Sequence, residues 1–131
     1  MEDCIFCKII KGELPSKTIY EDDMIKVIMN INPSTNGHLL VLPKKHYTNI
    51  MDIDEEIITH SFEKIRDYLY PLLKDKLNCE GLTIAENNEH GQEIKHFHIH
   101  LTPRYANDQL AYVYNKEIIE DLDRIYQTIT E

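Results

Sequence analysis

His96-Phe97-His98-Ile99-His100-Leu101-Thr102-Pro103 alternates imidazole rings with apolar side chains. Successive side chains on a strand point to opposite faces, so the alternation predicts a strand over residues 94–102. Its apolar face would lie on a core, and its three imidazoles would share a working face at spacings of about 6 to 7 Å. The alternative without a function is a solvent-exposed polar face whose residues are histidines by chance. Packing alone, however, does not require three imidazole rings on one strand. The segment therefore indicates a β-sheet with a reactive or ligand-binding site on one face.

Short strand-like segments lie on both sides of this stretch. They span residues 18–21, 24–29, 38–42 and 81–85, with loop-like composition over 32–37 and 87–91. Strands before and after one long helix, without repeated βαβ units, are typical of an α+β fold with an antiparallel sheet. We therefore expect about five antiparallel strands.

Two helices are predicted from apolar residues that recur at steps of three and four. The long one spans about residues 54–77, with Asp52 and Glu55 at capping-box spacing and Pro71 expected to kink or split it. A short C-terminal helix carries apolar residues between 118 and 129, with Asn115 as a possible cap. These two helices complete the expected α+β fold.

The length of 131 residues fits one domain, and a hydrophobic content of 42% is close to the globular average. We expect a single domain over residues 1–131, with a motif-bearing core at about 4–105 and a less distinctive tail at 106–131. No apolar run approaches the roughly 18 to 20 residues that span a bilayer, and the acidic start at residues 1–4 is unlike a signal peptide. These features predict a soluble, cytoplasmic protein with no membrane partner.

The formal net charge is −9, from 14 basic and 23 acidic side chains. Sequence-independent binding of nucleic acid depends on clustered Lys and Arg, so this balance argues against a nucleic-acid partner. Residues 1–50 hold six acidic and six basic side chains, so the excess of acid lies in the later part of the chain. An anion site is therefore expected near the first half, or built from histidines and backbone amides.

Two chemistries could use the row His96, His98 and His100. Alternating imidazoles could bind a catalytic zinc ion and leave a position open for water. Alternatively, a neutral imidazole could act as a nucleophile toward phosphorus, because its ordinary pKa near 6.5 leaves it mostly unprotonated at pH 7. The spacing of the residues does not separate these alternatives.

Cys4 and Cys7 form a C-x-x-C pair. In a chain that is not exported, such a pair indicates metal or redox chemistry rather than a structural disulfide. Redox pairs usually start a helix within a βαβ unit, and that context is missing from the pattern. A closed zinc site needs four nitrogen or sulfur ligands, so distant histidines would have to complete it. Two unpaired buried thiols are the alternative.

Three separated motifs occur in order along the chain. They are Cys4-Ile5-Phe6-Cys7-Lys8-Ile9, Gly37-His38-Leu39-Leu40-Val41-Leu42-Pro43-Lys44-Lys45-His46, and Gly91-Gln92 followed by His96-x-His98-x-His100-x-x-Pro103-Arg104. Together they resemble the histidine triad (HIT) family, most closely its small nucleoside-phosphoramidase-like branch. The resemblance implies a small α+β domain that forms a homodimer through its long helix and an edge strand. It also implies cleavage at the α-phosphate of a nucleoside phosphoramidate or dinucleoside polyphosphate, through a covalent nucleotidyl-histidine.

The resemblance assigns catalytic roles to individual residues. His98 would be the nucleophile, and His96 would help to orient it through its backbone carbonyl. His100 would hydrogen-bond the phosphate or the leaving group, and His38 would close the cluster from the neighbouring strand.

The resemblance also implies contacts with a purine nucleotide. Asn87 and Gln92 match positions that touch the phosphate and the bridging atom, and Ile31 matches an apolar contact of the nucleoside. Asn30 stands where relatives usually carry an acidic residue that binds the ribose hydroxyls, and Glu93 stands where a small hydroxyl residue commonly meets the phosphate. The Glu93 carboxylate would repel the substrate unless it turns away or pairs with a leaving-group amine. These two departures motivate an alternative function, a nucleotide-binding module or scaffold with weak catalysis.

Family members with this cysteine pair often hold zinc, and the matching ligands are Cys4, Cys7, His46 and His96. The resemblance thus implies a structural zinc ion and no organic cofactor. A zinc-dependent hydrolase that uses the histidine row directly remains the other alternative.

Overall fold

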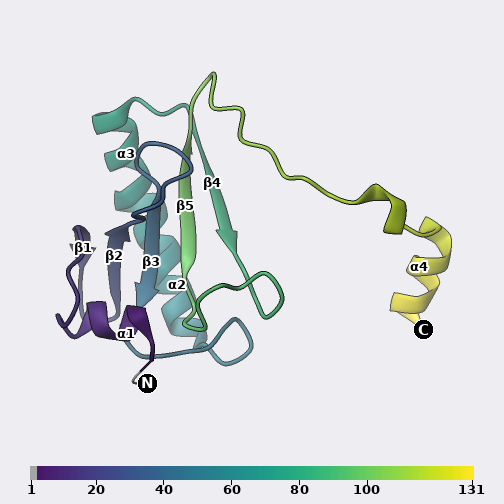
Figure 1. Ribbon diagram of the computed structural model, residues 1–131, viewed down its shortest axis with the longest axis horizontal. Helices are drawn as coiled ribbons and strands as arrows, with labels where there is room; N and C mark the ends of the chain where they lie inside the picture. The colour runs from purple at the N-terminus through teal and green to yellow at the C-terminus, as the bar shows by residue number, and fades with distance from the viewer. Residues whose placement is uncertain (1–2) are drawn as a thin grey trace.

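A five-stranded antiparallel sheet forms the centre of the computed structural model, which describes residues 3–131 (Figure 1). The strands are β1 (Thr18–Glu21), β2 (Ile25–Met29), β3 (Leu39–Pro43), β4 (Gly81–Glu86) and β5 (Ile99–Arg104). Their order is β1-β2-β3-β5-β4, and all neighbours are antiparallel. The predicted α+β fold is confirmed. Met1 and Glu2, part of the acidic start, lie outside the described residues.

The histidine-rich strand is shorter than predicted. β5 begins at Ile99, so His96 and His98 precede the strand and only His100 lies within it. The Phe97 amide donates to the Tyr47 carbonyl oxygen at 2.7 Å instead of joining a ladder, so the chain enters the sheet only afterwards. The predicted alternation still holds, because the apolar members of the stretch, Phe97, Ile99 and Leu101, belong to the main core.

The long helix runs without a break from Glu55 to Leu77. It comprises α2 (Glu55–Lys64), a π-helical segment (Ile65–Leu69) and α3 (Tyr70–Leu77). Pro71 has no amide hydrogen to donate to a carbonyl four residues back. The Tyr70 amide just before it donates to the Ile65 carbonyl, five residues back, and this wider turn lets the helix continue. The expected kink or split therefore takes the form of a π-helical turn.

The capping box predicted at Asp52 is wrong. The N-cap of α2 is Asp54, whose side chain makes no capping hydrogen bond. The Asp52 carboxylate instead accepts from the amides of Thr48 and Asn49, both at 2.9 Å, and so organises the preceding loop.

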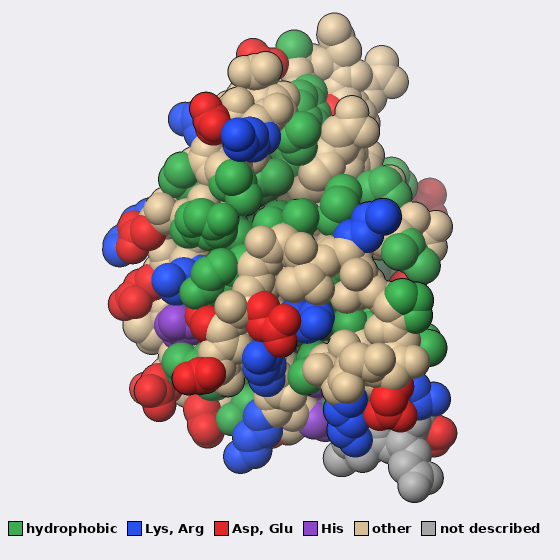
Figure 2. All heavy atoms as spheres, turned by 90° about the vertical axis from the view of Figure 1, so that its left-hand side faces the viewer, with side chains coloured by type: hydrophobic (Ala, Val, Ile, Leu, Met, Phe, Trp, Pro, Cys, Tyr) green, Lys and Arg blue, Asp and Glu red, His purple; other side chains and the backbone are tan. Residues whose placement is uncertain are grey.

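Two apolar layers lie on opposite faces of the sheet. The long helix covers one face, where Ile65, Leu69 and Leu73 pack with strand residues in the main core. A short helix, α1 (Ile5–Ile10), lies on the other face, where Phe6 packs in a smaller cluster. Viewed from the β1 side, acidic and basic side chains are intermixed with apolar ones across the surface (Figure 2). Within residues 3–131, no helix combines the length and apolarity needed to cross a membrane.

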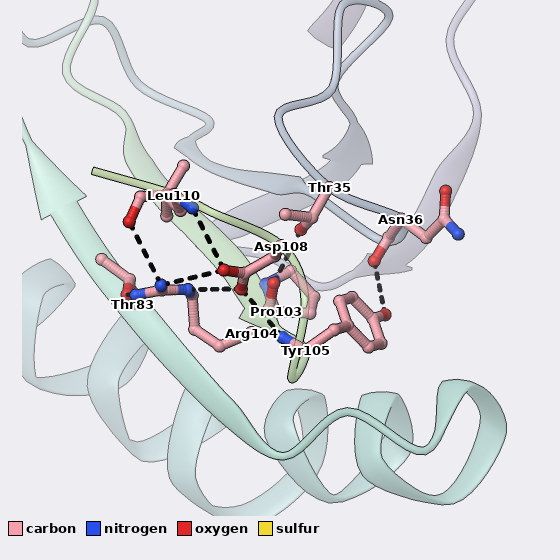
Figure 3. Close-up of polar contacts among 8 residues, drawn as sticks. All are labelled: Thr35, Asn36, Thr83, Pro103, Arg104, Tyr105, Asp108 and Leu110. Carbon is pink, nitrogen blue, oxygen red and sulfur yellow. Dashed lines mark hydrogen bonds and ion pairs between the residues drawn. The ribbon is translucent and has the colours of Figure 1, made fainter. Parts of the chain in front are cut away.

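A network of hydrogen bonds fixes the end of β5, where the chain leaves the sheet (Figure 3). The Arg104 guanidinium binds the Asp108 carboxylate through Nε at 2.7 Å, and the Tyr105 hydroxyl donates to the Asn36 carbonyl at 2.7 Å. The Thr35 hydroxyl donates to the Pro103 carbonyl at 2.7 Å. Arg104 is therefore occupied in holding this turn.

Beyond this turn an arm extends away from the sheet and ends in α4 (Leu122–Thr130) (Figure 1). All residues of the arm from 111 to 131 are exposed. The predicted C-terminal helix is confirmed, but its cap is Asp121, which accepts from the Arg124 amide. Asn115 caps a separate 3₁₀ turn, Lys116–Ile118.

Gly37 allows the loop before β3 to pack against the long helix. Its φ of +89° is a left-handed conformation, and an added Cβ would lie 2.5 Å from Leu77 Cδ1 and 3.3 Å from Leu73 Cδ2 and Pro103 Cγ. Gly12 has a similar φ of +82°, with nothing within 4 Å of an added Cβ.

We predict that Gly37→Ala lowers the free energy of unfolding by about 2 to 4 kcal/mol, the sum of backbone strain and overpacking. Gly12→Ala should cost only about 1 to 2 kcal/mol, because backbone strain acts alone there. Urea unfolding of both variants measures the difference, and equal losses would contradict the packing role of Gly37.

Candidate functional site

A hollow of about 740 Å³ opens on the α1 side of the sheet, beside the histidine-rich segment. Its apolar lining comes from α1, β2, β3 and the segment before β5, and includes Ile5, Phe6, Ile9, Ile28, Leu40 and Ile94. Its polar lining includes Asn30, Asn32, Asn87, Glu93, His98 and His100. The hollow thus combines an apolar floor with a cluster of amides and imidazoles, as small-molecule sites commonly do.

His98 is held in one tautomer by the backbone. Its side chain is buried, and its Nδ1 lies 2.8 Å from the carbonyl oxygen of His96. A carbonyl oxygen can only accept a hydrogen bond, so the ring hydrogen is on Nδ1 and the lone pair is on Nε2. Burial lowers the pKa of His98 below its ordinary value of 6.5, against a smaller raising effect of the His96 carbonyl and the Glu93 charge. The ring is therefore neutral at pH 7, with a free nucleophilic nitrogen.

A relay of hydrogen bonds fixes the hydrogens of His38 and His100. The Ser34 amide donates to His38 Nδ1 at 3.0 Å, which places the His38 hydrogen on Nε2. That atom lies 2.9 Å from His100 Nδ1 and donates to it, so His100 carries its own hydrogen on Nε2. Burial lowers the pKa of His38, and together with the charges of His98 and His38 it lowers that of His100 to about 4. His100 is thus a neutral N–H donor whose ring centroid lies 4.9 Å from that of His98.

Four potential metal ligands converge behind this pair. The sulfur and nitrogen atoms of Cys4, Cys7, His46 and His96 all lie within 4.8 Å of one another. His96 Nδ1 is 3.3 Å from Cys4 Sγ, 3.6 Å from Cys7 Sγ and 3.1 Å from His46 Nδ1. Ligand atoms placed tetrahedrally around a zinc ion are about 3.3 to 3.8 Å apart, so the cluster has suitable dimensions.

The tautomer of His96 also suits a metal ligand. Its ring is fully buried, and its Nε2 lies 2.9 Å from the Pro43 carbonyl oxygen, which can only accept. The hydrogen is therefore on Nε2, and the Nδ1 lone pair faces the cluster. Burial is also the main cause that lowers the pKa of His96, to about 4, and so keeps the ring neutral.

The cysteine pair does start a helix, which the sequence pattern did not indicate. Cys4 is the N-cap of α1, and its Sγ accepts from the Cys7 amide at 3.2 Å. No βαβ unit surrounds it, because β1 and β2 are antiparallel neighbours. The helical spacing of Ile5, Phe6, Ile9 and Ile10 was the available signal for α1.

The structure divides the histidine row between two sites. His98 and His100 line the hollow, whereas the His96 ring belongs to the cysteine cluster. In residues 3–131 this cluster is the one group of three or more His, Cys, Asp or Glu side chains arranged to hold a metal ion. A zinc hydrolase that uses the whole row is therefore not supported by the geometry.

The predicted substrate contacts are only partly brought together. Asn30, Ile31 and Asn87 line the hollow, as expected for contacts with a nucleotide. Gln92 does not line it: its side chain is buried, and its Nε2 donates to the carbonyls of Thr48 at 2.6 Å and Ile94 at 3.0 Å. Gln92 therefore holds the loop before β5.

Phe6 is a site residue that no pattern in the sequence singled out. Its ring packs edge-on against the rings of His98 and His96, with centroids 5.1 and 5.8 Å apart. Phe6 thus packs against a histidine of each site and also lines the hollow.

Comparison with known proteins places this architecture in a family. The model of the HIT domain matches residues 11–107 of the chain. An uncharacterised HIT-like protein of Methanocaldococcus jannaschii is 37% identical over 96% of this chain and 98% of its own length. A protein of Arabidopsis thaliana named as an adenylylsulfatase is 36% identical over 82% of this chain and 55% of its own length.

Solved structures agree with this assignment. A crystal structure from Streptococcus mutans is 34% identical with a TM-score of 0.85, covering 99% of this chain and 83% of that chain. A zinc-bound histidine triad family protein from Mycobacterium smegmatis is 31% identical with a TM-score of 0.78, and the match covers 87% of this chain and 84% of that chain. The chain therefore belongs to the HIT domain family, which includes hydrolases.

Proposed function

We propose that this protein hydrolyses or transfers a nucleotide at its α-phosphate through a covalent bond between His98 Nε2 and phosphorus. The observation that carries the proposal is the hydrogen bond from His98 Nδ1 to the His96 carbonyl, beside an open hollow. It leaves a neutral ring with its lone pair on Nε2.

In the first step, Nε2 would form a bond to phosphorus while the bond from phosphorus to the leaving group breaks. The leaving group takes the electron pair and gains a proton. The ring, still protonated on Nδ1, becomes positively charged, and the His96 carbonyl stabilises that charge. Water then attacks phosphorus, releases the nucleotide and gives up a proton, so that His98 returns to its starting state.

His100 would support the charge that develops on the phosphate oxygens. It is a neutral donor next to His98, and its hydrogen is oriented by the His38 relay before the substrate binds. Donors that are fixed in advance cost no reorganisation during the reaction. Neutral hydrogen-bond donors of this kind bind a phosphate at short range, so they can hold it even in a protein with a net negative charge.

The remainder of the hollow suits a purine nucleoside. The apolar lining, with Ile9, Ile28 and Leu40, can pack against a base, and Asn30 also lines the hollow. The Asn30 Oδ1 accepts from the Asn32 amide at 2.9 Å, which leaves its Nδ2 hydrogens to donate to ribose hydroxyls. The adenylylsulfatase name of the Arabidopsis relative is in keeping with an adenylyl substrate.

We predict that His98→Ala lowers the turnover of adenosine 5′-phosphoramidate at least about a thousandfold, because the nucleophile is removed. His90→Ala is the matched control, since His90 is a loop histidine outside the lining of the hollow, and should retain wild-type turnover. The release of AMP measures turnover. Intact-protein mass spectrometry should show an adenylyl adduct on the wild type and none on His98→Ala. Full hydrolysis by His98→Ala would end the assignment. Binding of AMP by the wild type without turnover would indicate the scaffold function instead.

We further propose that Cys4, Cys7, His46 and His96 hold a zinc ion. The ligand distances and the His96 tautomer support this proposal, and the M. smegmatis relative is zinc-bound. Zinc would supply a rigid link between α1 and the segments that carry the two histidines. Through His96 this link would keep the carbonyl that orients His98 in place.

Metal analysis of the purified protein tests the zinc site. We predict about one zinc ion per chain, lost in Cys7→Ser together with a lower melting temperature, because a closed site contributes to folding. Cys79→Ala is the matched control: Cys79 is a buried cysteine of the main core and should leave the zinc content unchanged. Chelation should reduce turnover while His98 can still be adenylylated. Zinc retained in Cys7→Ser would contradict this ligand set.

A further inference from the structure

Of the described residues that line the hollow, Glu93 is the one that carries a charged side chain. It is exposed and shares the lining with His98, His100 and Asn87. Among the ion pairs of residues 3–131, none involves Glu93. The Glu93 carboxylate therefore faces the same hollow as the His98 ring, without an ion-pair partner among the described residues.

The backbone that carries Glu93 is held on both sides. Gln92, the preceding residue, is buried, and its side chain donates to two carbonyls and accepts from the Glu89 amide at 3.0 Å. Ile94, the following residue, packs against the smaller apolar cluster. Glu93 therefore projects from a fixed segment, and its position beside the hollow is a property of the fold.

Among residues 3–131, no Lys or Arg belongs to the lining of the hollow, so no basic side chain of this part opposes Glu93 there. The nearby Lys95 Nζ is bound to the carbonyls of Glu89 and Gln92, at 3.0 and 2.9 Å, and Arg104 is paired with Asp108. A polyphosphate leaving group would bring further negative charges to a site that offers a carboxylate and no cation. A leaving group with an ammonium would gain the attraction that Glu93 provides.

We propose that Glu93 selects nucleoside phosphoramidates whose leaving group is a primary amine that carries a second, positively charged group. The inference rests on the proposed function and names its substrate class. The P–N bond breaks as His98 Nε2 bonds to phosphorus, and the amine nitrogen leaves with the electron pair and gains a proton. The water that later cleaves the nitrogen–phosphorus bond to His98 gives up a proton, so the protons balance. Glu93 acts by binding the distant ammonium, and it is a specificity-determining residue.

Two adenosine 5′-phosphoramidates test this inference, one made from 1,4-diaminobutane and the other from the neutral, similarly shaped pentylamine. The quantity measured is the ratio of their kcat/KM values. We expect the wild type to favour the diamine at least about tenfold at low salt, and to lose much of this preference at 0.5 M salt. In Glu93→Gln the ratio should fall to about one. Glu89→Gln is the matched control, because Glu89 is in the same loop but outside the lining, and it should keep the wild-type ratio.

The outcomes separate the inference from the function on which it rests. If the wild type cleaves both amides equally, or if Glu93→Gln keeps the preference, the role of Glu93 is overturned while the His98 chemistry stands. If neither amide is cleaved and no adduct forms on His98, the proposed function fails and the inference fails with it. A preference that disappears in Glu93→Gln and persists in Glu89→Gln supports both.

Discussion

The hydrogen bond from His98 Nδ1 to the carbonyl oxygen of His96 is the constraint on which the site depends. It determines which ring nitrogen keeps a lone pair, and the other tautomer would place a hydrogen where the nucleophilic nitrogen must be. The carbonyl is held in turn, because the His96 ring donates to Pro43 and lies against the cysteines of α1, while the Phe97 amide donates to Tyr47. Contacts at the start of the chain are thereby linked to the geometry of a ring almost a hundred residues later.

The polar groups that line the hollow are mainly neutral amides and imidazoles. The chain carries a formal net charge of −9, and within residues 3–131 no Lys or Arg lines the hollow, so under the proposed function the attraction of phosphate would depend on fixed N–H donors. The relay from the Ser34 amide through His38 to His100 supplies such a donor, and burial lowers the pKa of both rings so that they stay uncharged. That an anion binds here, through histidines and backbone amides, stays a prediction. Within that neutral setting the described lining holds a single carboxylate, Glu93, on which the proposed selection of substrates depends.

The sequence was sufficient for the fold class, the long helix and the convergence of His38, His98 and His100. It was insufficient where the outcome depends on distant partners. Alternation of polar and apolar residues shows which side chains share a face of a strand, but not where the strand begins to pair with its neighbour. The start predicted for β5, at residue 94, is therefore wrong, because the strand begins at Ile99. Gln92 is bound to the Thr48 carbonyl, a contact across 44 residues that leaves no local pattern. The homodimer, the purine preference and the cytoplasmic location stay predictions.

Nitrogen-15 NMR of the histidine rings reports directly on the tautomer of His98. We expect a neutral ring at pH 7, with hydrogen on Nδ1 and an unprotonated Nε2. Because burial lowers the pKa of His98, the ring should stay neutral as the pH falls below 6.5, where an ordinary imidazole gains a proton. A hydrogen on Nε2, or a charged ring at pH 7, would rule out a nucleophilic Nε2 at His98.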